Sequence, residues 1–141
     1  MNKKGITLIE LLIVVAIIGI LAVIAVPAYI GQQRNAARTE AYSNLQNLRL
    51  LEEQYYAENS CYYREGNPLT CTNKNIPNVA SIQAFLPGFK PGDEASLNFT
   101  YSITTTGTSP ASAFTATATG KTGRRVAGDV FTINQNNVRN F

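Results

Sequence analysis

The sequence predicts an α+β protein in which one long N-terminal helix packs on a small antiparallel β-sheet. Three observations support this prediction. The 23 positions from Leu11 to Gln33 carry no charge and are mostly apolar. An apolar stripe with spacings of three and four then continues to Tyr55, as on one face of a helix. Apolar and polar residues alternate in the last third of the chain, which is typical of half-buried strands.

Length and composition fit one small domain plus an anchor. The chain has 141 residues, of which 45% are hydrophobic and 15% charged, and a net charge of +3. This mild charge does not by itself indicate a nucleic-acid partner. We divide the chain into a leader (1–5), a transmembrane or assembly half of the helix (6–30), an amphipathic half (31–58), an αβ loop with a disulfide (59–95) and the sheet (96–141).

The first half of the helix is apolar on all sides, as a lipid-embedded or bundled helix requires. About 20 helical residues cross a bilayer core, so this half is long enough to span it. Lys3 and Lys4 favour a cytoplasmic N-terminus. Gly19 weakens the helix and Pro27 removes a hydrogen bond, so we expect flexibility there and a kink at Pro27. Membrane helices also tolerate such residues without any functional reason.

The second half of the helix is amphipathic. Its apolar stripe is expected to cover the apolar face of the sheet, while the charged residues are expected to lie largely off this stripe. The stripe consists of Ala37, Ala41, Leu45, Leu48, Leu51 and Tyr55, and the charged set of Arg34, Arg38, Glu40, Arg49, Glu52 and Glu53.

Two cysteines, Cys61 and Cys71, flank a segment that contains Gly66 and Pro68. A disulfide between them closes about 11 residues and contributes about 2.7 kcal/mol in the chain-entropy model. Two free thiols or half of a metal site are the alternatives. Because the chain has no histidine and a metal site needs more ligands, we expect neither a metal nor another cofactor.

Three alternating runs predict the strands of the sheet. They begin near Leu97, Phe114 and Val130 and are separated by turn signals at Gly107 with Pro110 and at 120–128. Short connections between consecutive strands predict an antiparallel meander.

Glu10 is the unusual residue of the apolar segment. A carboxylate at the centre of a bilayer costs roughly 2.5–3.5 kcal/mol or more, so we expect it to have a role. An ordinary secretory signal is the alternative, but its apolar core is usually only 7–15 residues long and has no use for a carboxylate.

The segment KGITLIELLIVVAIIGILAVIAVP, residues 4–27, resembles the N-terminus of type IV pilins and of their relatives in type II secretion. The resemblance implies a pilin fold and a structural role in a filament. It also implies cleavage by a prepilin peptidase between Gly5 and Ile6 and N-methylation of Ile6, where most members carry Phe. In this family the segment corresponding to 19–27 often loses helicity in the filament.

Cleavage after Gly5 gives Glu10 a physical role. The new amine on Ile6 lies four residues, about 6 Å of helix, before the carboxylate. A subunit displaced along the axis is expected to place its amine against Glu10 of a neighbour, so that each buried charge compensates the other. The alternative is that Glu10 binds the amine of its own chain. Thr7 is a candidate cap of the helix.

The resulting expectation is a non-enzymatic subunit that polymerises into a helical homo-oligomer. It starts as a single-pass inner-membrane protein, with the peptidase and the pilus assembly machinery as partners, and ends in a surface pilus used for adhesion, motility or DNA uptake. The basic turn Lys121, Arg124 and Arg125 is interpreted as a solvated loop, with DNA binding as the alternative.

Two rival functions remain. The first is a type II secretion pseudopilin, whose major form binds calcium through acidic C-terminal loops. Here that region offers only Asp129 after Glu94, which disfavours this rival. The second is a secreted binding module with a cleaved signal peptide, whose mature chain begins near Tyr29.

Overall fold

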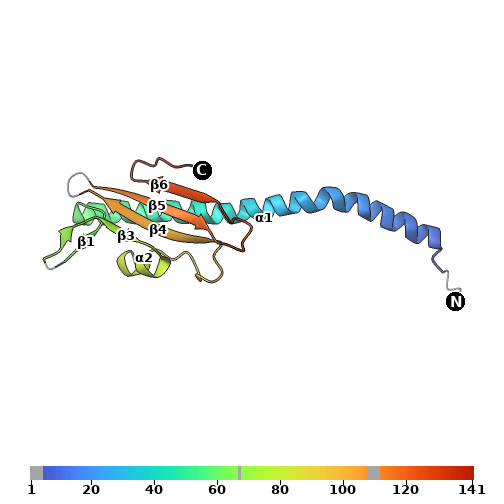
Figure 1. Ribbon diagram of the computed structural model, residues 1–141, viewed down its shortest axis with the longest axis horizontal. Coiled ribbons are helices and arrows are strands. Elements are labelled where there is room, and N and C mark those ends of the chain that lie inside the picture. The colour runs from blue at the N-terminus through green and yellow to red at the C-terminus, as the bar shows by residue number, and fades with distance from the viewer. Residues whose placement is uncertain (1–4, 67, 108–111) are drawn as a thin grey trace. The chain divides into compact units, whose positions relative to one another are not determined.

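The computed structural model describes residues 5–66, 68–107 and 112–141 (Figure 1). It comprises two compact units, residues 1–35 and 36–141, which we describe separately. The elements in chain order are α1 (Leu8–Asn59), β1 (Arg64–Glu65), β2 (Thr70–Cys71), β3 (Lys74–Ile76), α2 (Val79–Phe85), β4 (Phe99–Thr106), β5 (Ala113–Gly120) and β6 (Val130–Asn134).

Helix α1 is the 52-residue helix that the sequence predicts. It remains helical through Gly19 and Pro27, so the proline is accommodated within the helix. The helix ends where Ser60 adopts a left-handed conformation with φ of 61°. The Ser60 N–H donates to the carbonyl of Tyr56 at 2.7 Å, which satisfies one of the last helical acceptors.

The larger sheet is an antiparallel meander in the order β3-β4-β5-β6. The three predicted runs form β4, β5 and β6, and the alternation is confirmed because Phe99, Tyr101 and Ile103 are buried between exposed or half-buried neighbours. A backbone carbonyl closely approaches the last residue of β5. A Cβ added to Gly120 would lie 1.8 Å from the carbonyl oxygen of Val126, so only glycine fits there.

The sheet packs on the second half of α1 (Figure 1). Ala41, Leu45 and Leu48 are fully buried in one core with residues of β4 and β5. This arrangement confirms the α+β fold class, in which an amphipathic helix covers the apolar face of an antiparallel sheet.

Residues 59–95 contain more regular structure than a loop region. The hairpin of β1 and β2, the edge strand β3 and the seven-residue helix α2 all fall there. These elements are too short to show a clear periodicity in sequence. Helix α2 nevertheless has a readable start, because the Asn78 side chain caps it by accepting from the Ser81 N–H at 2.8 Å.

The position of Glu52 differs from the predicted assignment of apolar and charged residues to opposite faces of the helix. We expected it off the apolar stripe, but it is fully buried in the line that contains Leu45 and Leu48. Its spacing of four from Leu48 places it on that face, and its charge led the prediction away from this position. Burial raises the pKa of Glu52 from 4.5 to about 8, with a smaller contribution from the negative charge of Glu53.

Candidate functional site

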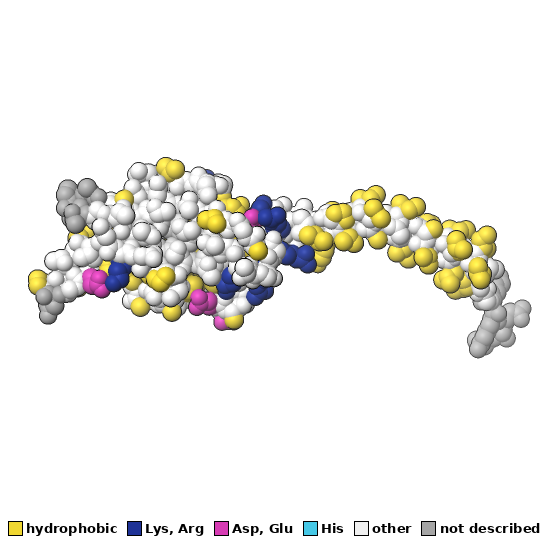
Figure 2. All heavy atoms as spheres, in the orientation of Figure 1, with side chains coloured by type: hydrophobic (Ala, Val, Ile, Leu, Met, Phe, Trp, Pro, Cys, Tyr) yellow, Lys and Arg dark blue, Asp and Glu magenta, His cyan; other side chains and the backbone are white. Residues whose placement is uncertain are grey.

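The first half of α1 exposes nearly all of its apolar side chains. Figure 2 shows them in yellow along this segment. Large apolar residues from Ile6 to Ile30 have exposed fractions between 44% and 81%. The segment is long and apolar enough to cross a membrane, and none of its residues is buried within the chain. Such a surface requires lipid or other protein chains around it.

Thr7 and Glu10 form a reciprocal capping box at the start of this helix. The Glu10 N–H donates to Thr7 Oγ1 at 3.3 Å. The Glu10 carboxylate accepts from the Thr7 N–H at 2.9 Å and from the Thr7 hydroxyl at 2.7 Å. The predicted role of Thr7 as a helix cap therefore has a geometric basis, and two of the unpaired N–H groups at the helix start are satisfied.

The predicted cleavage junction lies beside the same carboxylate. Gly5, Ile6 and Glu10 line one shallow groove of about 440 Å³ together with Leu11 and Val14. Ile6 is 80% exposed, and a Cβ added to Gly5 would meet no atom within 4 Å. The peptide bond and the carboxylate that the sequence singles out are thus neighbours on an open surface. Residues 1–4, which include Lys3 and Lys4, lie outside the described residues.

Gly19 and Pro27 lie inside the continuous helix, and a Cβ on Gly19 would likewise meet open space. Close helix packing within this chain therefore does not account for Gly19. The predicted flexibility of these two positions stays a prediction.

A disulfide joins Cys61 and Cys71, whose Cα atoms are 6.0 Å apart. It confirms the predicted pairing. The bond ties the end of α1 to the hairpin, in which Arg64 pairs directly with Cys71. It therefore fixes the position of the β1–β2 hairpin relative to the second half of α1.

The basic turn between β5 and β6 is held against the rest of the domain. The Lys121 ammonium group donates to the carbonyl of Glu94, and the Arg124 guanidinium group donates to the carbonyl of Ala95 at 2.9 Å. Arg125 is exposed. At the end of the turn, Asp129 accepts two hydrogen bonds from Arg38, at 2.8 and 3.1 Å. Sequence patterns gave no sign of this ion pair because its partners are 91 residues apart.

Metal-binding geometry is absent from the described residues, where no three His, Cys, Asp or Glu side chains form a possible metal site. The exposed apolar helix, the Glu10 carboxylate capped by Thr7 and the disulfide-linked domain together suit a protein that assembles with other chains.

Comparison with known proteins agrees with this picture. Residues 1–26 match the family described as the prokaryotic N-terminal methylation motif. Residues 27–129 match the family described as type IV minor pilin ComP, DNA uptake sequence receptor, which covers more than half of the chain. No solved structure matches the chain.

Individual relatives are pilins and fimbrial proteins. The type IV major fimbrial protein FimA of Dichelobacter nodosus is 36% identical over 99 residues, which are 65% of this chain and 62% of FimA. The type IV major pilin protein PilA of Myxococcus xanthus is 48% identical over 61 residues, 43% of this chain and 28% of PilA. The type IV major pilin protein PilE of Neisseria gonorrhoeae is 38% identical over 81 residues, 57% of this chain and 46% of PilE. The matches thus span less than two thirds of each relative.

Proposed function

Because this chain belongs to the type IV pilins, in the family of the minor pilin ComP, we propose that it is processed and polymerised as a subunit of a surface pilus. The observation that supports this proposal most strongly is the exposed apolar first half of α1 with Glu10 at its start. In this proposal the precursor waits in the inner membrane, anchored by its apolar helix. A prepilin peptidase cuts after Gly5, the amine of Ile6 is methylated, and the assembly machinery extracts the subunit into the filament.

The capping box supports a specific sequence of events at Glu10. In the uncleaved chain its carboxylate accepts two hydrogen bonds from Thr7, which lowers the cost of holding the charge in lipid. Cleavage adds a cationic amine at Ile6. When a neighbouring subunit brings its amine to Glu10, a charge-assisted bond replaces or joins the bonds to Thr7, which gives both register and driving force.

Processing is tested by the intact mass of this chain in material sheared from the cell surface. We expect a mass that corresponds to residues 6–141, with or without one methyl group. A chain that begins near Tyr29 would instead identify a secreted module. Retention of the processed chain in the cell envelope, with none in the sheared fraction, would favour a pseudopilin.

The Glu10 pairing is tested by the Glu10→Ala variant. We expect membrane insertion to persist and surface filaments to be lost, because an incoming amine then has no buried counter-charge. Normal amounts of filament would contradict the pairing. Glu10→Asp is a matched control that keeps the charge, and we expect it to retain more filaments than Glu10→Ala.

The calcium-binding rival loses support from the Arg38–Asp129 ion pair. Asp129 was the sole acidic residue expected to be available after Glu94, and both of its carboxylate oxygens accept hydrogen bonds from Arg38. A hard cation needs several oxygen ligands, usually with more than one carboxylate. The pair therefore favours a pilus subunit over a calcium-dependent pseudopilin.

DNA binding is a second candidate function, favoured by the family match that extends across the basic turn. We propose that Arg125, with Lys121 and Arg124, binds backbone phosphates. The test is binding of duplex DNA to the full chain in detergent at several salt concentrations. Arg125→Gln should weaken binding. It should also lower the slope of the logarithm of the binding constant against the logarithm of salt concentration by about 1, the value for one phosphate that is no longer neutralised. An unchanged slope would contradict the role of this turn.

A further inference from the structure

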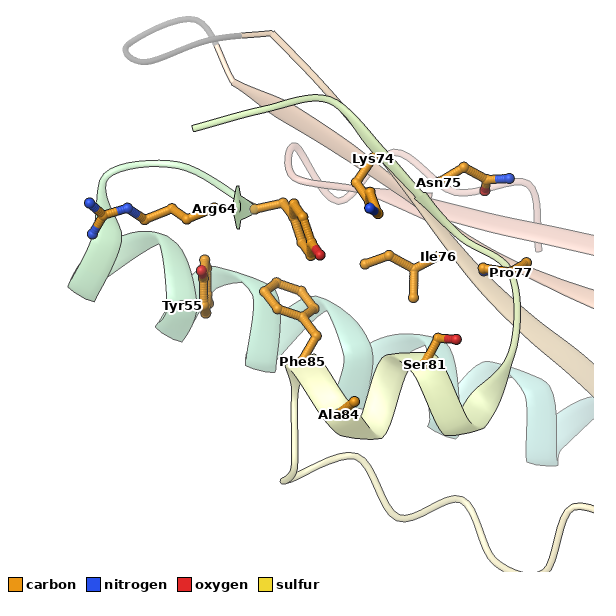
Figure 3. A pocket seen from close by; sticks show the side chains of 10 residues that line it. Tyr55, Arg64, Lys74, Asn75, Ile76, Pro77, Ser81, Ala84 and Phe85 are labelled. Atoms are coloured by element: carbon orange, nitrogen blue, oxygen red, sulfur yellow. The ribbon is translucent and has the colours of Figure 1, made fainter. Parts of the chain in front are cut away.

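A groove on the domain of residues 36–141 is not used by the proposed assembly mechanism. It has a volume of about 520 Å³, which is in the range of small-molecule sites. Figure 3 shows side chains from α1, β3 and α2 around it. Its lining consists of Tyr55, Tyr63, Arg64, Lys74, Asn75, Ile76, Pro77, Ser81, Ala84 and Phe85.

Three aromatic rings form one wall. Phe85 lies 4.5 Å from Tyr55 and 4.9 Å from Tyr63, between ring centroids, with interplanar angles of 64° and 59°. All three residues are half-buried, so the rings are supported by the domain while parts of them remain open to the groove. Such a rigid aromatic surface suits stacking with another ring at little entropic cost.

The Lys74 ammonium group, two neutral polar side chains and the stem of Arg64 complete the lining, while the Arg64 guanidinium group points away from the other side chains (Figure 3). Arg64 donates to the carbonyl of Leu69 at 2.8 Å and to Asn59 Oδ1 at 3.4 Å, both of which are neutral acceptors. Asn75 and Ser81 are exposed on β3 and α2. Among the described residues that line the groove there is no carboxylate. The lining therefore favours an anion that also carries hydrogen-bonding groups and an apolar ring face.

Lys74 retains capacity for such a ligand. Its ammonium group lies 5.6 Å from the centroid of the Tyr63 ring and pairs with Glu65 at 2.8 and 3.0 Å. The two side chains are 38% and 52% exposed, and ion pairs this exposed contribute at most about 1 kcal/mol. An ammonium group has three donors, so a ligand carboxylate can share Lys74 or displace Glu65 at small cost.

The walls come from segments far apart in sequence and are fixed in place. The Cys61–Cys71 disulfide holds the hairpin that carries Arg64, because Cys71 is the residue paired with it. The N-cap at Asn78 fixes the start of α2, from which Ser81 projects (Figure 3). The site is thus formed before any ligand arrives, which reduces the cost of binding.

We infer that this groove binds an acidic saccharide, with the C–H face of a sugar ring against the aromatic wall and its carboxylate at Lys74. Asn75 and Ser81 then supply hydrogen bonds to hydroxyl groups. A nucleic-acid strand is less suitable, because it requires cations along an extended track, whereas the described lining of this groove is local and presents the Lys74 ammonium group. The inference goes beyond filament assembly and does not depend on it.

The test uses the full chain in detergent with two probes, cellobiouronic acid and cellobiose, which differ only in one carboxylate. The chain has no tryptophan, so tyrosine fluorescence reports on the groove through Tyr55 and Tyr63 among the chain's seven tyrosines. We expect the acidic probe to bind at least five-fold more tightly than the neutral one. Equal affinities, or no binding of either probe, would overturn the inference.

Matched charge variants locate the binding. Lys74→Gln should weaken binding of the acidic probe at least five-fold, whereas Glu65→Gln should strengthen it by removing the competing carboxylate. Lys90→Gln is the control, since this exposed lysine lies outside the groove and should leave affinity unchanged. Affinities that do not follow these opposite signs would contradict the site. Displacement of the acidic probe by a short single-stranded oligonucleotide, with tighter binding of the oligonucleotide, would instead assign the groove to nucleic acid.

Discussion

The two halves of α1 have similar apolar residues and opposite environments. Leu8 in the first half is 81% exposed, whereas Leu45 in the second half is fully buried beneath the sheet. The first half has Glu10 at its open start, and the second has Glu52 enclosed in the core. Helix formation alone therefore does not determine the role of either half. What differs is where the partners come from, which for the first half must be lipid or other chains.

The largest expected effect concerns the carboxylate buried in the second half. Burial raises the pKa of Glu52 from 4.5 to about 8, so the folded state binds more protons than the unfolded state between these values. The free energy of unfolding should therefore fall as pH rises through this window, by up to about 4–5 kcal/mol. Denaturant unfolding of the full chain in detergent at pH 4 and pH 9, on either side of this window, measures the loss.

The Glu52→Gln variant is the control for this pH effect. It keeps the shape of the side chain and cannot ionise, so its stability should change much less over the same range. If the variant and the original chain lose stability in parallel, Glu52 is not the titrating group. The charge of Glu52 also acts on Tyr55 and Tyr62. Burial raises the pKa of both tyrosines above their ordinary value of 10.0, so they titrate above this window.

Truncation of matched leucines tests the comparison between the halves directly. Leu45→Ala should cost about 2–5 kcal/mol of unfolding free energy, because it removes buried methyl groups and leaves a cavity. Leu12→Ala, at a position that is 61% exposed, should leave the stability of the domain unchanged within about 0.5 kcal/mol. Equal losses in denaturant unfolding would mean that the first half also packs within its own chain.

Removal of the disulfide should have an intermediate effect. The Cys61→Ser and Cys71→Ser double variant should lose about 2.7 kcal/mol, the value for a closed loop of about 11 residues. Thermal and denaturant unfolding in the absence of reductant measure the difference. Membrane insertion should be unchanged, since the disulfide lies in the domain of residues 36–141 and not in the apolar first half of α1. A failure to insert would contradict the view that the first half of α1 inserts independently of the disulfide.

The smallest effect is expected at the start of α1. Thr7→Ala removes the N-cap side chain and should destabilise the first helical turn by about 1 kcal/mol. Amide hydrogen exchange in micelles should show faster exchange at Glu10, whose N–H is bonded to Thr7 Oγ1, and no change in the core strands. Thr7→Ser is the matched control because it keeps the hydroxyl group. Unchanged protection at Glu10 in Thr7→Ala would contradict the capping box.

Much of the architecture was predictable because strong periodic patterns specified it. The helix and the three alternating strands were evident from residue spacing. The disulfide was expected because the chain has two cysteines and no histidine. Thr7 was the expected cap, and its bonds with Glu10 have the spacing of a known capping box. The short elements between 64 and 85 were not predicted, since two or three residues cannot establish a period. The spacing of Glu52 from Leu48 indicated the buried face, but its charge argued against burial, and the outcome depended on tertiary packing. The Arg38–Asp129 pair joins residues 91 positions apart, and local sequence carries no signal for it.

We propose that the first half of α1 finds its partners in other copies of the chain. The most direct measurement is zero-length carbodiimide cross-linking of filaments that contain both 15N- and 14N-labelled subunits, followed by peptide mapping. We expect an amide bond between the Ile6 amine and the Glu10 carboxylate in peptides of mixed isotope composition. Cross-links found exclusively within one isotope, which means within one chain, would contradict it.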